Sequence, residues 1–292
     1  DQQTAGDLTS PMLMAVINGH FDLALDLLDR GADPNVPSHA GLTPLYAAIN
    51  TYWAPKARYP QQQAYRQQQA DHLDVMEAML EAGADPNVPL DKHLWFMEYT
   101  FSPLDVDTRR ATPFWRAAYA LDLPAMRMLV AYGADPNVPT MKAPERRFGG
   151  GGAADRGDPS GLPPVPVGGP DVYPIHAATG HAYGTGFAGV SHRHAPEAWL
   201  PAVKYLVEEL GADVNARDAN GFAPLHWAAS RGDNEMIHYL VEKGADATVV
   251  ARSGQTTADM ANGPVQRISP FPETIALLES LGSKNNNNCQ SC

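Results

Sequence analysis

A repeated hexapeptide constrains the fold of this chain more than any other feature. Gly-Ala-Asp-Pro-Asn-Val occurs at Gly31–Val36, Gly83–Val88 and Gly133–Val138, and shorter versions follow at Gly211–Asn215 and Gly244–Asp246. A phrase of this length that returns in order indicates structural repeats, each of which packs mainly on its neighbours. The chain is therefore predicted to form an elongated stack of similar units.

Each copy of the hexapeptide is predicted to end a helix and to form a turn. Apolar helical runs precede the copies, such as the run that ends with Met79 and Leu80 before Gly83. Glycine adopts the left-handed conformation that ends a helix without a steric penalty. Asp and Asn side chains then bond back to the backbone, while Pro prevents the helix from continuing.

A second phrase is predicted to begin the next helix. It occurs as Thr-Pro-Leu-Tyr-Ala-Ala from Thr43, and in similar form from Thr112 and Ala223. Thr is a favourable N-cap, and Pro is tolerated at the first helical position. Because the two phrases alternate along the chain, they predict helix-turn-helix units.

Together, the two phrases resemble the ankyrin repeat, which begins its first helix with Thr-Pro-Leu-His-x-Ala and has a glycine before its turn. The resemblance covers most of residues 9–282 and implies an all-α ankyrin-repeat solenoid that binds protein partners. About six units are expected, starting near Ser10, Thr43, Thr112, Tyr173, Ala223 and Thr256. We expect residues 1–282 to form one ankyrin-repeat domain, followed by a polar tail at 283–292.

The spacing of the units predicts long insertions. The glycines of successive turns are 52, 50, 78 and 33 residues apart, and only the last interval equals the ankyrin period. Inserts are therefore expected near 51–70, 90–110, 140–171 and 179–196. Insertions in solenoids form surface loops that often build the binding face.

The 90–110 insert is rich in aromatic residues, namely Trp95, Phe96, Tyr99 and Phe101. The rings could belong to an extended hairpin and fold onto the adjacent helices. Alternatively, they form an aromatic patch for a partner, because such side chains dominate the energetics of interfaces. The second interpretation makes these four residues candidate partner-binding residues.

The 179–196 insert contains His181, His192 and His194. Histidine is a common metal ligand, and a His-x-His pair in an extended segment can direct two rings to one side. However, no carboxylate or cysteine with metal-site spacing lies nearby. His176 and His226 occupy the repeat's own His position, where the ring normally bonds to neighbouring backbone. We predict no metal site here and treat His192 and His194 as partner-binding residues.

The other two inserts are predicted to lie on the surface. Glutamines in 51–70 indicate a solvated helical extension or a polar loop. Prolines and glycines in 140–171 indicate an extended segment that cannot form a core of its own.

The chain ends with Cys289 and Cys292, which follow a run of asparagines. A disulfide, half of a metal site, c-type haem attachment and a thioredoxin-like redox pair are four open interpretations, of which haem attachment requires a histidine after Cys292. The whole pattern, with its long inserts and this ending, resembles an uncharacterised group of secreted bacterial ankyrin-repeat proteins. The resemblance implies a periplasmic or secreted location and a cytochrome or another exported component as partner. The two cysteines give an alternative function, a redox- or metal-linked accessory protein of a cytochrome-type system.

Composition and motifs exclude several classes of function. A net charge of −12 argues against general binding of nucleic acid or anionic membranes. There is no apolar run of about 18 residues, so no membrane span is predicted. Because the first residue is Asp1, we expect a processed protein or a fragment.

No nucleophile elbow, zinc-protease helix, kinase loop or dinucleotide fingerprint occurs in the sequence. The chain is therefore predicted to be a non-enzymatic protein-interaction module without a cofactor. It is expected to bind through its concave face and its inserted loops.

Overall fold

The computed structural model describes residues 8–54, 64–94, 106–144, 157–182, 194–263 and 269–287. These residues form an all-α solenoid. The helices are α1 (Pro11–Ile17), α2 (Phe21–Asp29), α3 (Pro44–Tyr52), α4 (His72–Glu81), α5 (Pro113–Tyr119), α6 (Leu123–Ala131), α7 (Pro174–Thr179), α8 (Trp199–Lys204), α9 (Pro224–Ser230), α10 (Asn234–Glu242), α11 (Thr257–Ala261) and α12 (Pro272–Ser280). A 3-10 turn at Ala64–Gln67 and a π-helical turn at Tyr205–Glu209 complete the set.

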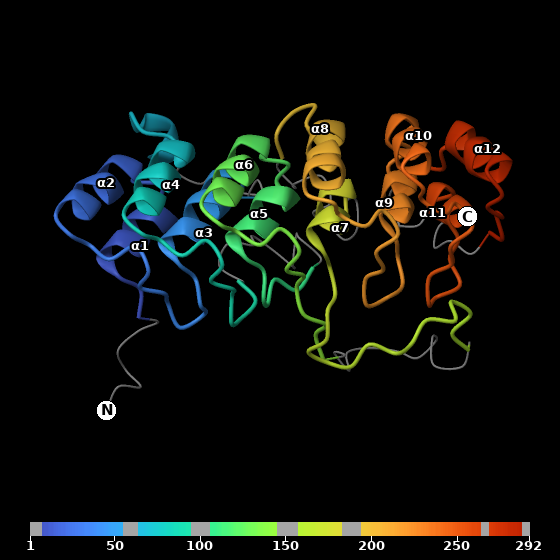
Figure 1. Cartoon of the computed structure of the whole chain (residues 1–292), viewed down its shortest axis with the longest axis horizontal. Coiled ribbons are helices and arrows are strands. Elements are labelled where there is room, and N and C mark those ends of the chain that lie inside the picture. The colour runs from blue at the N-terminus through green and yellow to red at the C-terminus, as the bar shows by residue number, and fades with distance from the viewer. Residues whose placement is uncertain are drawn as a thin grey trace.

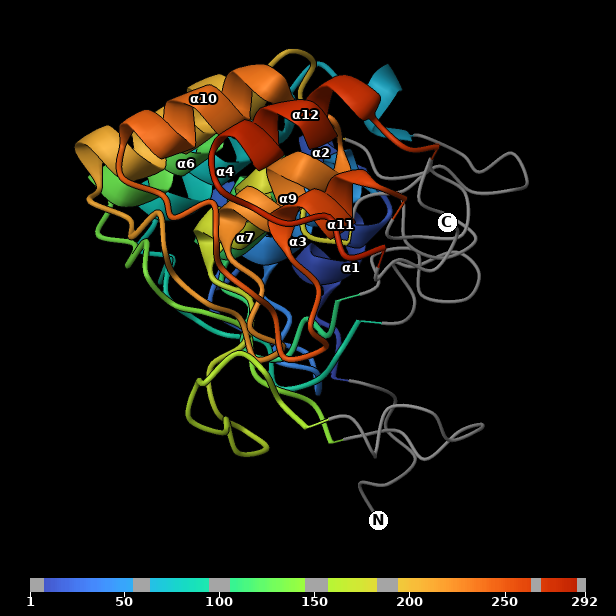
Figure 2. The same ribbon diagram turned by 90° about the vertical axis from the view of Figure 1, so that its right-hand side faces the viewer.

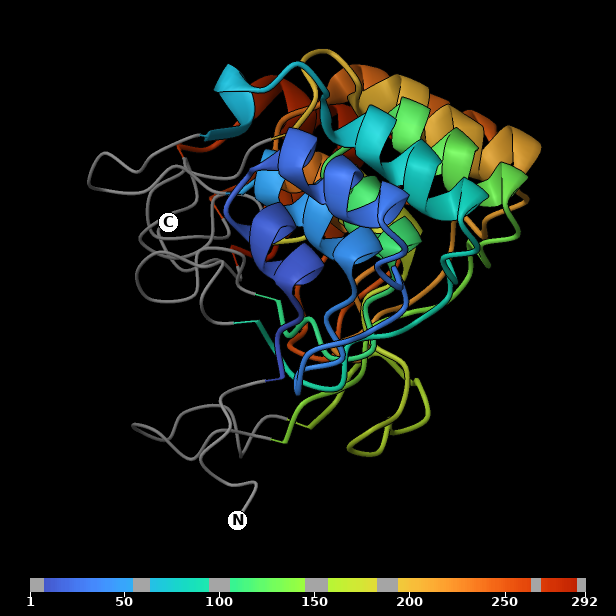
Figure 3. The same ribbon diagram turned by 90° about the vertical axis from the view of Figure 1, so that its left-hand side faces the viewer.

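The helices form six pairs, here called units one to six, stacked side by side (Figure 1). The first helix of each pair (α1, α3, α5, α7, α9, α11) lies in one row. The second (α2, α4, α6, α8, α10, α12) lies in the other. End-on views show the rows as two layers, with the connecting turns projecting from one side (Figures 2 and 3). The predicted fold class and the six unit starts are confirmed.

The first helices begin where the sequence places their caps. The Oγ1 atoms of Thr43, Thr112 and Thr256 each accept a hydrogen bond from the backbone N–H three residues later. The alanine pairs that follow are completely buried in units two to five. Small side chains at these positions let neighbouring first helices pack closely.

The turn glycines have the predicted left-handed backbone. Their φ angles lie between +71° and +95° at Gly31, Gly83, Gly133, Gly211 and Gly244. A Cβ atom would meet nothing within 4 Å at any of these five positions, so backbone conformation alone accounts for the glycine. The Asp of each turn then accepts a hydrogen bond from the N–H two residues later, as Asp33 does from Asn35 at 2.8 Å.

The Asn of the turn phrase ties one unit to the next. Asn35 Nδ2 donates to Gly83 O at 2.9 Å, and Asn35 Oδ1 accepts from Asp85 N at 2.8 Å. We call this pair of hydrogen bonds an asparagine bridge. The same bridge joins Asn87 to Gly133 and Asp135. Asn215 forms it with Gly244 and Asp246.

The repeat histidines have the predicted structural role. His176 Nδ1 accepts from Tyr173 N, and its Nε2 lies 3.0 Å from Ala216 O in the adjacent turn. His226 makes the corresponding contacts with Ala223 N and Gln255 O. Burial lowers the pKa of His176 to about 4 and that of His226 to about 3. Both rings are therefore neutral near pH 7.

All four inserts begin and end on described residues. In 51–70, the carboxylate of Asp22 accepts hydrogen bonds from Gln69 N and Ala70 N, which fixes the end of the insert to the start of α2. In 90–110, Leu90 N donates to Ala111 O and Arg110 N donates to Leu90 O. The base of this insert is thus closed by paired backbone.

The 140–171 insert is also closed at its base, where Thr140 N donates to Val172 O and Asp171 N donates to Thr140 O. Residues 157–171 of this insert run below the turns of the C-terminal units (Figure 1). There the guanidinium of Arg252 donates to the carboxylate of Asp158 and to the carbonyl of Leu162. The segment is thus held extended on the surface.

In the described ranges, every helix is too short or too polar to cross a lipid bilayer.

Candidate functional site

Unit four has one residue more than unit five between its second helix and its turn. Gly244 follows Leu240 by four positions, whereas Gly211 follows Leu206 by five. Ala212 N accordingly bonds to the carbonyl six residues earlier, while Ala245 N bonds to the carbonyl five residues earlier. The π-helical turn Tyr205–Glu209 absorbs this extra residue, as π-turns typically do.

The junction between units three and four lacks an asparagine bridge. Asn137 is the equivalent of Asn35 and Asn87, yet within the described ranges its side chain forms no hydrogen bond. In the same part of the structure, Gly211 O and Asp213 N are also unpaired. Pro136 is half-buried, whereas the equivalent prolines of units one and two are buried. The turns of units three and four are therefore separated.

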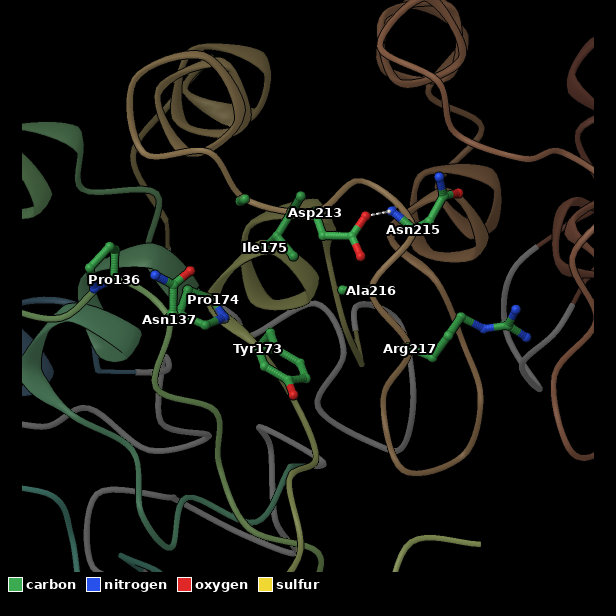
Figure 4. Close-up of a pocket in the computed structure, with 10 residues that line it drawn as sticks. Pro136, Asn137, Tyr173, Pro174, Ile175, Asp213, Asn215, Ala216 and Arg217 are labelled. Atoms are coloured by element: carbon green, nitrogen blue, oxygen red, sulfur yellow. Dashed lines mark hydrogen bonds between the residues drawn. The ribbon is translucent and has the colours of Figure 1, made fainter. Parts of the chain in front are cut away.

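A cavity of about 400 Å³ occupies this separation (Figure 4). Pro136, Ile175 and Ala216 contribute apolar surface, and Asn137 and Asp213 contribute polar groups from opposite sides. Its size lies in the lower part of the range found for ligand pockets.

Two further residues define the character of the pocket. The ring of Tyr173 lies along its floor in Figure 4. Arg217 also lines it, but its guanidinium points away and donates to Gly221 O and Val250 O. The pocket therefore presents apolar surface, an amide, a carboxylate and unpaired backbone, and no free cation among its lining residues.

The opposite side of the junction is closed. Arg127 of α6 donates to Glu209 of the π-helical turn at 2.8 Å, and its guanidinium lies 4.2 Å from the ring centroid of Tyr205. Trp115 Nε1 donates to Val172 O at 2.8 Å and so holds the entry to unit four against unit three. The two units thus contact each other through their helices and separate at their turns.

Most of the residues predicted as sites lie outside the described ranges, namely Trp95, Phe96, Tyr99, Phe101, His192, Cys289 and Cys292. His194 is described and lies away from the pocket. Its ring is 4.6 Å from that of Trp199, over which Arg231 stacks at 3.5 Å. Burial lowers the pKa of His194. No cluster of three or more metal-ligating side chains occurs in the described ranges.

Sequence reasoning missed the pocket, although a signal was present. The 78-residue interval marked the insert before unit four. A residue-by-residue alignment of units four and five would also have shown the extra residue next to Leu210. That residue belongs to the helix end and not to any insert.

Asp218, in the loop before α9, and His181, just after α7, form a buried pair. Asp218 Oδ1 accepts from Asn220 N and Phe222 N, while its Oδ2 lies 3.6 Å from His181 Nδ1. Burial, with the charge of Asp171, raises the pKa of Asp218 to about 8. Burial also lowers the pKa of His181 to about 3.

Replacement of this carboxyl should stabilise the protein at alkaline pH. An unfolded Asp218 ionises near its ordinary value of 3.8, whereas the folded carboxyl retains its proton up to about pH 8. The wild type therefore loses stability as pH rises between these values, and Asp218→Asn does not. As the pH is raised from 5 to 9, we expect the melting temperature of Asp218→Asn to increase by several degrees relative to that of wild type, since 1 kcal/mol corresponds to about 2–4 °C. An equal difference in melting temperature at pH 5 and at pH 9 would contradict the raised pKa of Asp218.

Comparison with known proteins identifies the class. The family profile described as "Ankyrin repeats (many copies)" matches residues 12–51, 191–241 and 225–269. With six stacked helix pairs and the turn phrases, this makes the chain an ankyrin-repeat protein.

Its relatives contain similar repeats in different settings. The chain is 33% identical over 85 residues to "Ankyrin repeat domain-containing protein 37" of Bos taurus, covering 29% of this chain and 54% of that protein. It is 36% identical over 83 residues to "Ankyrin repeat and SAM domain-containing protein 6" of Rattus norvegicus, covering 28% and 9%. It is 33% identical over 95 residues to "Protein phosphatase 1 regulatory subunit 12A" of Rattus norvegicus, covering 32% and 8%. The matched segment is thus a small part of the last two proteins.

Proposed function

We propose that this chain is a non-enzymatic protein-binding scaffold that receives a protein partner at the junction between units three and four. The pocket of about 400 Å³ supports this proposal most directly. Among the described residues, it lies at the one junction between turns of the hexapeptide type that has no asparagine bridge. Ankyrin stacks are binding structures in general, because their repeats present extended surfaces.

The composition of the pocket fits a polypeptide better than a small charged metabolite. Its walls combine proline and aliphatic surface with an exposed amide, Asn137, and with the unpaired backbone N–H of Asp213. Apolar contact supplies affinity, while a few placed polar groups fix the orientation of a ligand. Peptide groups satisfy such amide and backbone positions directly.

Site-specific photo-crosslinking tests the proposal. Tyr173 in the full chain is replaced by the photoreactive residue p-benzoylphenylalanine, and the protein is irradiated in an extract of the organism that makes it. We expect one partner protein to be crosslinked at position 173, and unmodified chain in excess to abolish the product.

Tyr132 provides the matched control, since it is an exposed aromatic residue of unit three that does not line the pocket. The same photoreactive residue at position 132 should give no such product. Equal crosslinking at both positions, or no product at 173, would contradict the proposal.

The other predicted contacts remain proposals beside this one. The aromatic residues of the 90–110 insert and the histidines of 179–196 would extend the surface that a partner contacts. A periplasmic or secreted location and a redox partner for Cys289 and Cys292 are likewise predictions from the sequence.

A further inference from the structure

We infer that the junction pocket recognises a Gly-x-Asp-x-Asn turn of the partner protein, which binds as the missing layer between units three and four. This inference rests on the proposed binding function and specifies the chemistry of the ligand. It is derived from the three asparagine bridges that the chain itself forms.

Each bridge is a recognition event between an amide and a backbone segment. One Asn donates to the carbonyl of a glycine and accepts from the N–H of the aspartate two residues later, with both distances between 2.8 and 2.9 Å. The glycine is left-handed in every case. The turn position of Asn35, Asn87 and Asn215 is therefore specific for the backbone of a Gly-x-Asp turn.

At the open junction, the two halves of a bridge lie apart. Asn137 and Asp213 line the pocket, and Gly211 lies two residues before Asp213. The Asn137 amide, Gly211 O and Asp213 N are not paired with any described residue. Figure 4 shows Asn137 on one side of the pocket and Asp213 on the other.

One inserted turn would complete both halves. The Gly carbonyl and Asp N–H of the ligand turn would bond to Asn137. The Asn amide of the ligand would bond to Gly211 O and Asp213 N. Two bridges would then replace the one that is missing, and each would repeat a geometry that the chain already uses.

The apolar part of the pocket indicates the residue between Asp and Asn in the ligand. In the chain's own closed bridges this residue is Pro34, Pro86 or Val214, and all three are buried. A proline or valine of the ligand would cover Pro136 and Ile175 in the same way. The volume of about 400 Å³ accommodates a short turn and excludes a folded domain.

The probe for the test is the chain's own phrase as a capped peptide, acetyl-Gly-Ala-Asp-Pro-Asn-Val-amide. It is titrated into the ¹⁵N-labelled full chain, and backbone and side-chain amide signals are followed by NMR. We expect saturable shifts centred on Asn137, Gly211 and Asp213, with a dissociation constant on the order of 1 mM, as a few net hydrogen bonds would give. The peptide with Ala in place of its Asn should bind about tenfold more weakly.

Two variants of the chain complete the test. Asn137→Ala changes an exposed side chain without a described partner, so it should abolish the shifts and leave the melting temperature unchanged. Asn87→Ala breaks a closed bridge, so it should lower the melting temperature and leave peptide binding intact.

Deletion of Leu210 gives unit four the same spacing between helix and turn as unit five, and it should close the junction between units three and four. We expect this variant to melt at a higher temperature, to lose peptide binding, and to show slowed exchange of the Asn137 side-chain amide. Circular dichroism verifies that it folds, and Asn137→Ala tests the proposal independently if it does not.

Unaltered peptide binding by Asn137→Ala, or equal shifts at Asn35 and Asn87, would overturn the inference. A dimer that forms without peptide and dissociates on Asn137→Ala would also overturn it, by making a second copy the occupant. If the peptide fails while crosslinking at position 173 succeeds, the ligand chemistry is wrong and the binding function stands. If both fail, the binding function falls as well.

Discussion

Replacement of Asp122 by alanine is expected to destabilise the protein by about 2–4 kcal/mol, through the loss of its buried hydrogen bonds and of a helix cap. Asp122 is 3% exposed and joins three elements. Its Oδ2 accepts from Trp53 Nε1 at 2.7 Å and lies 2.6 Å from His72 Nε2, while its Oδ1 caps α6 by accepting from Ala125 N. The variant removes the acceptor that His72 in the core and the half-buried Trp53 share, and it removes a cap. Chemical denaturation measures the loss.

Asp122→Asn is the matched variant, because its amide oxygen can still cap α6. We expect it to cost less than alanine. A cost below about 1 kcal/mol for Asp122→Ala would show that the buried cluster contributes little.

The pH dependence of stability provides a second measurement on the same residue. Burial works to raise the pKa of Asp122, but hydrogen bonds from His72 and Trp53 outweigh it and hold the pKa below the ordinary 3.8. The stability from this carboxylate is thus present above pH 3.8 and is lost as pH falls through the lowered folded value. Asp122→Asn should flatten this part of the acid unfolding curve.

Replacement of Trp115 by alanine is expected to cost about 3–5 kcal/mol, as for other buried aromatic residues. Trp115 is completely buried, and its ring stacks on Tyr119 with centroids 5.2 Å apart. It also donates from Nε1 to Val172 O, the residue at which the chain returns from its longest insert. The variant should therefore both create a cavity and release the entry to unit four.

Trp115→Phe separates these two effects, since it keeps most of the ring volume and removes only the donor. We expect an intermediate loss of about 0.5–1.5 kcal/mol, because one hydrogen bond to Val172 O is lost while Thr140 N still donates to that carbonyl. Faster amide exchange of Thr140 and Asp171, whose backbone pairs beside Val172, should accompany it. Equal stability of wild type and Trp115→Phe would show that this hydrogen bond is dispensable.

The fold could be predicted because its signals are local. Thr43 and Pro44 define a helix start within two residues, and Gly83 defines a helix end by the backbone conformation that it alone adopts without penalty. Similar short signals recur in most units, so they specify the order of the helices along the chain.

The candidate site could not be predicted in the same way, because it depends on contacts between distant residues. Whether Asn137 is bridged is decided by the position of Gly211, which follows a 78-residue interval and a π-helical turn. The buried cluster of Asp122 likewise combines His72 and Trp53 from unit two. Neither grouping leaves a pattern in adjacent residues. The predicted aromatic contacts at Trp95–Phe101 are untested, since they fall outside the described residues.

The attachment of segment 157–171 affects which partner proteins can bind the C-terminal units. Arg252 holds this segment against the loop of Ala219, below the turns of the C-terminal units (Figure 1). A tethered segment of this kind acts as a ligand at an effective concentration on the order of 1 mM. A partner protein that binds this edge of the C-terminal units must therefore displace the tethered segment, whose effective concentration does not fall on dilution. A protein that enters at the Asn137 junction does not face that competitor.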